Sequence, residues 1–138
     1  MITKKIICVW IGTFEVETSL YQDYLTISYD DDDMTESAFG TDTGLGYYDE
    51  DFMESWWFNH LDLSTLMAYK KDLLDADYFF DSLIAELQTR DLSTRHSILF
   101  LFGETGEHPT NEMLFEYTGA TKAGSPIEFV FKKEYEPK

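Results

Sequence analysis

The chain has 138 residues, and its 27 aspartates and glutamates outnumber 10 lysines and arginines to give a formal net charge of −17. This balance argues against direct binding to nucleic acid or to anionic membranes, since both depend on Lys and Arg meeting phosphate. Hydrophobic residues make up 43% of the chain and aromatic residues 17%, which excludes a disordered acidic chain and predicts one folded domain over residues 1–138.

The first predicted element is a buried strand from Ile6 to Ile11, an apolar and β-branched run that ends at Gly12. Residues 16–25 predict a helix, because four apolar or aromatic side chains recur at helical spacing: Leu20, Tyr21, Tyr24 and Leu25. Residues 28–46 contain three glycines, an acidic run and few aliphatic side chains, so we expect a long loop there.

The stretch GYYDEDFMESWWF, residues 46–58, places four acids among six aromatic rings. Its aromatic positions fit one face of a helix, and they also fit the alternation of a strand. Two Trp and two Phe within seven residues are typical of strand composition, so we favour a strand.

Residues 63–92 predict two helical pieces, of which the second can be capped by Asp75 or Asp77. Three further strands are predicted at residues 97–102, 113–117 and 127–131, separated by turns rich in Gly and Pro. This order of elements predicts an α+β fold, with helices packed on one mixed or antiparallel sheet of about four to five strands.

The negative charge is unevenly placed along the chain. Between Ile6 and Tyr69 there is no Lys or Arg, whereas fourteen of the 27 acids fall in that segment. The remaining thirteen acids are nearly balanced by the ten cations, which all lie outside it. The first half therefore favours a cationic partner.

Signals for metal, cofactor or catalytic chemistry are few. The run Asp30, Asp31, Asp32 and Asp33 suggests calcium, but an EF-hand loop needs Gly at its sixth position and Glu at its twelfth, and neither register supplies them. The three histidines lack metal-ligand spacing, and no glycine motif matches a nucleotide-binding fingerprint. We therefore expect no metal site, no cofactor and no enzymatic activity.

Cys8 is the only cysteine, so no disulfide can form within the chain, and we expect a reducing cytoplasmic location. Its place inside the first apolar strand predicts a buried, unreactive thiol. No apolar run approaches the length needed to span a membrane.

Four segments together resemble the bacterial immunity protein 22 family: VWIGTF at 9–14, the helix that ends near Leu25, SAFGTDTGLGYYDEDFMES at 37–55, and the strand SILFLF. Proteins of this family are predicted neutralisers in polymorphic toxin systems, made beside a toxin to protect the producing cell. The resemblance implies an α+β fold, no enzymatic activity and a toxin as partner.

The residues and the resemblance favour the same mechanism, in which an acidic surface meets a basic toxin such as a nuclease. As toxin-facing candidates we name the four aspartates 30–33 and a second group: Asp49, Glu50, Asp51, Glu54, Trp56 and Trp57. Within this group, one Trp is expected to be a core anchor, whereas the other is available to the partner. The alternative is a small acidic enzyme or metal-binding domain with its site in residues 28–51.

Overall fold

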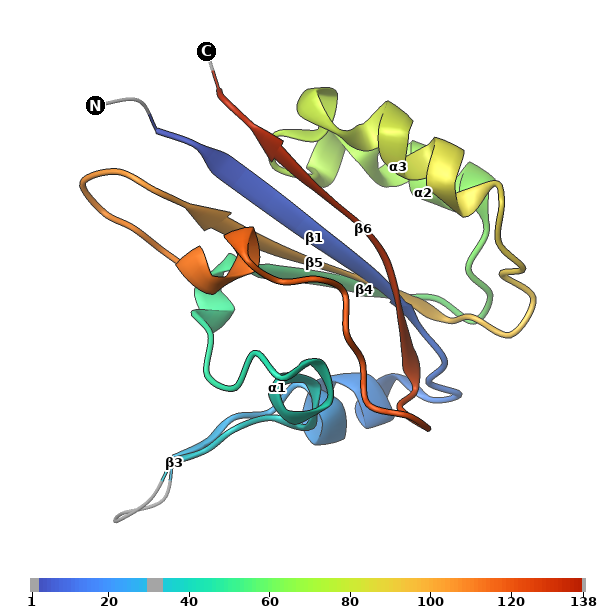
Figure 1. The fold of residues 1–138 in the computed structure, drawn as a ribbon. Helices are drawn as coiled ribbons and strands as arrows, with labels where there is room; N and C mark the ends of the chain where they lie inside the picture. The colour runs from blue at the N-terminus through green and yellow to red at the C-terminus, as the bar shows by residue number, and fades with distance from the viewer. Residues whose placement is uncertain (1–2, 30–33, 138) are drawn as a thin grey trace.

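The computed structural model describes residues 3–29 and 34–137. Its centre is a four-stranded antiparallel sheet in the order β4-β5-β1-β6, formed by Met53–Trp57, Ser97–Glu104, Lys5–Gly12 and Ile127–Tyr135 (Figure 1). The predicted α+β fold and the antiparallel sheet are confirmed, as are the strands at residues 6–11, 97–102 and 127–131. Within the ambiguous aromatic stretch, residues 53–57 form the strand β4, which lies at one edge of this sheet and pairs with β5, whereas residues 50–52 before it form a 3₁₀ turn.

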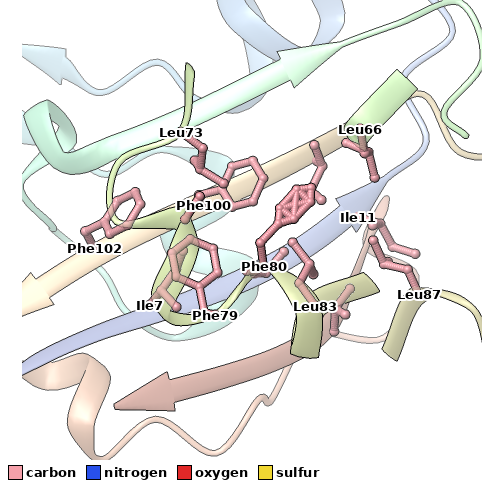
Figure 2. Packing of buried hydrophobic residues seen from close by; sticks show 14 of the residues in the cluster. Ile7, Ile11, Leu66, Leu73, Phe79, Phe80, Leu83, Leu87, Phe100 and Phe102 are labelled. Atoms are coloured by element: carbon pink, nitrogen blue, oxygen red, sulfur yellow. The ribbon is translucent and has the colours of Figure 1, made fainter. Parts of the chain in front are cut away.

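The sheet is covered on both faces. β1 and β5 are buried along almost their whole length, which explains why each reads as a continuous apolar run instead of an alternating one. One face carries α2 (Leu63–Tyr69) and α3 (Phe80–Leu87), joined through the 3₁₀ turns η3 (Lys70–Asp72) and η4 (Ala76–Tyr78). Figure 2 shows Phe79, Phe80, Leu83 and Leu87 from this layer against Ile7, Ile11, Phe100 and Phe102 of the sheet.

The opposite face is covered by shorter elements. They are the π-helix η1 (Ser19–Tyr24), α1 (Ala38–Thr43) and the 3₁₀ helix η5 (Glu112–Phe115). Trp10 is fully buried in this layer, with its ring edge-on to Phe39 at 4.8 Å between centroids. The helix expected at residues 16–25 is present in part as η1, which buries Leu20 and Tyr24.

The prediction of a long loop over residues 28–46 is wrong in part. The described residues there form the short antiparallel pair β2 (Ser28–Tyr29) and β3 (Met34–Thr35), followed by α1. Ser37 caps α1 by accepting a hydrogen bond from the Gly40 amide at 3.0 Å, and Gly44 ends it in the left-handed conformation at φ 75°. Glycine is a poor helix former inside a helix, so this short helix carries little periodic signal.

Two further predictions are wrong. Residues 113–117 form no strand: after Asn111, in the left-handed conformation at φ 44°, the chain enters η5 and buries Leu114 and Tyr117, which are three positions apart. Neither Asp75 nor Asp77 caps α3, whose cap position is Phe79. The Asp75 carboxylate instead pairs with Lys5 at 3.2 Å and accepts from the Tyr135 hydroxyl at 2.8 Å.

Candidate functional site

Asp49 begins the acidic segment and is held in place by Asn111, which lies 62 positions further along the chain. Its backbone amide donates to the side-chain Oδ1 of Asn111 at 2.7 Å, and its carbonyl accepts from Nδ2 of the same residue at 3.3 Å. Asn111 Nδ2 also donates to the Phe102 carbonyl at 2.9 Å, at the end of β5. One buried amide therefore ties the start of the acidic segment to the central sheet.

The acidic segment continues as a single 3₁₀ turn, η2 (Glu50–Phe52), which leads into β4. The Asp49 carboxylate caps this turn by accepting from the Asp51 amide at 3.1 Å, while Thr110 donates to its other oxygen at 3.3 Å. Asp49, Glu50, Asp51 and Glu54 are all exposed. The turn thus fixes the backbone and leaves four carboxylates facing solvent.

Four cations, Lys5, Lys70, Arg90 and Arg95, form ion pairs between described residues. The ion pairs between described residues join Lys or Arg to Asp75, Asp77, Glu86 and Glu128, and none involves Asp49, Asp51 or Glu54. Glu128 alone receives both Arg90 and Arg95, at 2.6 and 2.7 Å. The shortest ion pairs between described residues therefore lie at β6 and just after α3, whereas Asp49, Asp51 and Glu54 beside β4 take part in none.

The two tryptophans of β4 point to opposite faces of the sheet, as adjacent strand residues must. Trp56 packs beside α2 with its ring 5.0 Å from Phe100 and 5.5 Å from Tyr69, and its Nε1 donates to the Glu54 carboxylate at 2.9 Å. Trp57 packs in the opposite layer, and its Nε1 donates to the Phe14 carbonyl at 2.6 Å. Because both faces are covered, both side chains are half-buried, and neither is the freely exposed aromatic anticipated from the sequence.

The aspartates 30–33 lie outside the described residues. β2 and β3, which flank this run in the sequence, extend away from the four-stranded sheet (Figure 1). The candidates therefore divide between two places in the chain, and only the group at residues 49–57 has a described geometry.

Sequence reasoning missed a hollow beside the acidic turn. It has a volume of about 230 Å³ and lies between the start of β4 and the connection from α2 to α3. Phe52 and Leu74 line it while remaining 36% and 56% exposed, and Asp72 faces it from η3 together with Asp51 and Glu54. Leu73 is buried whereas its neighbour Leu74 is exposed, and nothing in the sequence indicated which of the two would face solvent.

Cys8 and the three histidines lie in different surroundings. Cys8 is buried, as its place in the apolar strand predicted, and burial raises the pKa of its thiol to about 12. His96 Nδ1 accepts from the Phe14 amide at 3.1 Å, and His60 and His108 are exposed. Within residues 3–29 and 34–137, no three His, Cys, Asp or Glu side chains come together as ligands for a metal ion.

Three comparisons bear on identity. A family model described as Immunity protein 22 matches residues 7–136, which is almost the whole chain. Searches against curated proteins and against solved structures gave no significant match. In the part of the chain that the structure describes, no helix is long and apolar enough to cross a membrane.

Proposed function

The chain belongs to the immunity protein 22 family, and from that membership we propose that it binds and neutralises a cognate toxin of a polymorphic toxin system. The family match over residues 7–136 is the observation that carries this proposal, because an immunity protein acts by meeting a specific toxin. We place its action in the cytoplasm of the producing cell, where a single cysteine stays reduced.

For the mechanism we propose that the acids beside β4 meet a basic surface of the toxin. A toxin that acts on nucleic acid must present cations to phosphate, and a carboxylate surface competes for the same cations. The accessible surface is 7734 Å², so a standard contact of about 800 Å² would hold only about two net charges if the −17 were evenly spread. An acidic contact therefore requires acids that are clustered on the surface, and Asp49, Glu50, Asp51 and Glu54 are four exposed acids within six residues.

The sequence led us to expect one tryptophan in the core and the other available to the partner, but we propose a different role for both. Trp56 and Trp57 are half-buried, so each presents only part of its ring while its other side holds the strand to the fold. Rigid aromatic surface of this kind costs little side-chain entropy on binding. We therefore assign the two tryptophans to the support of the acidic segment and the carboxylates to the encounter.

The test is neutralisation of the toxin encoded beside this chain. Cells expressing that toxin are expected to survive when the wild-type chain is co-expressed, and the two proteins are expected to co-purify. A variant with Asp49→Asn, Glu50→Gln and Asp51→Asn is expected to protect less well while it folds normally. Neutralisation without a stable complex would contradict direct binding, and unchanged protection by the variant would contradict the acidic mechanism.

A further inference from the structure

We propose that the hollow between β4 and the α2–α3 connection receives a single lysine or arginine side chain of the toxin. This inference rests on the proposed function, and it names the feature of the partner that the surface recognises. The hollow adjoins the acidic turn η2, because Asp51 and Phe52 belong to both.

The apolar part of the hollow suits an aliphatic stem. Phe52, Leu74 and Phe102 line it, and the first two belong to the few large apolar side chains that stay exposed. Phe102 is buried at the end of β5, so it supplies a floor that is already held by the core. Lysine and arginine bury their methylene groups along apolar surface of this kind and keep their charge at the polar edge.

The rim of the hollow suits a cationic head. Asp51, Glu54 and Asp72 supply three carboxylates from η2, β4 and η3, and the described residues that line the hollow include no Lys or Arg. The neighbouring hollow of about 620 Å³ differs, since Lys70 and Lys71 line it together with Asp75 and Asp77. The charged residues that line the smaller hollow are therefore all acids, whereas those of the larger one carry both signs of charge.

The size of the hollow favours a side chain over a free ligand. Pockets for small molecules usually have volumes of about 300 to 1,000 Å³, and this one holds about 230 Å³. An anchor residue of a partner protein needs only such a space, provided that apolar contact and charge pairing occur together. Arginine adds a planar group that can pair with two carboxylate oxygens and lie against the Phe52 ring.

The sharpest test introduces a cation into the hollow from the chain itself. Leu74→Lys places an ammonium group in the lining of the hollow, which it shares with Asp51, Glu54 and Asp72, at a position that is 56% exposed, so folding is expected to survive. Val16→Lys is the matched control, because Val16 is 54% exposed and lies outside this hollow. The probe is an inactive form of the toxin domain encoded beside this chain, and the measurement is Kd by calorimetry, with melting curves for each variant.

We expect Leu74→Lys to weaken binding more than tenfold and Val16→Lys to weaken it less than threefold. The triple variant Asp51→Asn, Glu54→Gln, Asp72→Asn is expected to lose at least tenfold, and it tests the rim should Leu74→Lys fail to fold. Wild-type affinity in a folded Leu74→Lys protein, or equal losses at Val16 and Leu74, would overturn the role of the hollow alone. Absence of binding by the wild-type chain would instead overturn the proposed function, and the hollow's role in it would fall as well.

Discussion

A methyl group on Gly40, inside α1, would overlap with the backbone carbonyl oxygen of Gly46. The two residues are also joined by a hydrogen bond from the Gly46 amide to the Gly40 carbonyl at 3.0 Å. The chain thus folds back on itself between Gly40 and Gly46. It continues into the buried Tyr48 and then into the acidic turn η2. Much of the segment that carries the family resemblance therefore builds the layer that supports Asp49.

Gly40→Ala is expected to lower the free energy of unfolding by about 1 to 3 kcal/mol, because the new methyl group meets backbone that cannot move aside freely. The measurement is urea denaturation followed by tryptophan fluorescence. Gly44→Asn is the control, since a Cβ added to Gly44 would meet no atom within 4 Å and Asn tolerates its left-handed conformation. A Gly40→Ala protein with the wild-type denaturation midpoint would show that the close approach is not required.

Asn111→Ala is expected to lower the free energy of unfolding by about 2 to 4 kcal/mol. The substitution leaves buried polar partners at Asp49 and Phe102 unsatisfied, and it places alanine at φ 44°. Asn111→Gly accepts that conformation but makes none of the side-chain hydrogen bonds, so its smaller loss isolates their contribution. Equal stability of the wild-type and Ala proteins in urea would contradict the anchoring of the acidic turn.

The central strands of this fold could be predicted from the sequence, whereas several short elements could not. The long apolar runs around Trp10 and Phe100 predicted central strands, because a short continuous run of apolar residues is typical of a strand that is buried on both faces. The α1 helix and the turn at Asn111 escaped prediction, because a serine cap, glycines and a left-handed asparagine set their geometry without any apolar period.

Only part of the candidate site could be predicted from the sequence, because some of its residues come together through tertiary packing. Asp49 to Glu54 are contiguous in the chain, so their clustering is visible in the sequence. Asp72 and Leu74 join them only through the tertiary packing of the α2–α3 connection against β4. Whether Trp56 and Trp57 are exposed depends likewise on what covers each face of the sheet, which strand alternation does not reveal.

Trp56→Ala and Trp57→Ala are expected to destabilise the fold by similar amounts, about 2 to 4 kcal/mol each, because each half-buried ring fills a covered face of the sheet. Trp57→Phe keeps one aromatic ring and removes the five-membered ring whose Nε1 donates to the Phe14 carbonyl, so its loss is expected to be smaller, about 1 kcal/mol. Thermal unfolding of the three variants gives the comparison. A Trp variant with unchanged stability and reduced toxin binding would instead identify that ring as a dedicated contact.

The Cys8 thiol is expected to resist modification in the folded protein at pH 8. Burial raises its pKa to about 12, so the reactive thiolate is scarce there, whereas an ordinary thiol with a pKa near 8.5 is partly ionised. Ellman's reagent should therefore react with the wild-type chain only after denaturation. A Val16→Cys variant, which retains Cys8, should release one equivalent at once and the second only on unfolding; rapid reaction of the native wild type would show that β1 opens readily.

Association with the toxin is expected to slow steeply as salt rises past physiological strength, where the Debye length is about 8 Å. The acids beside β4 act at long range during the encounter, whereas contacts already formed are screened less, so the dissociation rate should change little. Neutralising Asp49, Glu50 and Asp51 with Asn, Gln and Asn keeps the cap at η2, because asparagine also accepts hydrogen bonds there. This variant is expected to associate more slowly and to depend less on salt, as stopped-flow fluorescence would measure.

The control for that experiment must remove the same charge without breaking a structural contact. Glu128 is unsuitable because it pairs with both Arg90 and Arg95, whereas Glu107, Glu134 and Glu136 are exposed and take part in no ion pair between described residues. Their replacement by Gln is expected to leave the association rate close to that of the wild type. If both triple variants slow association equally, net charge alone steers the encounter; if neither does, recognition depends on shape and apolar contact, and the localised acidic surface beside β4 has no role in it.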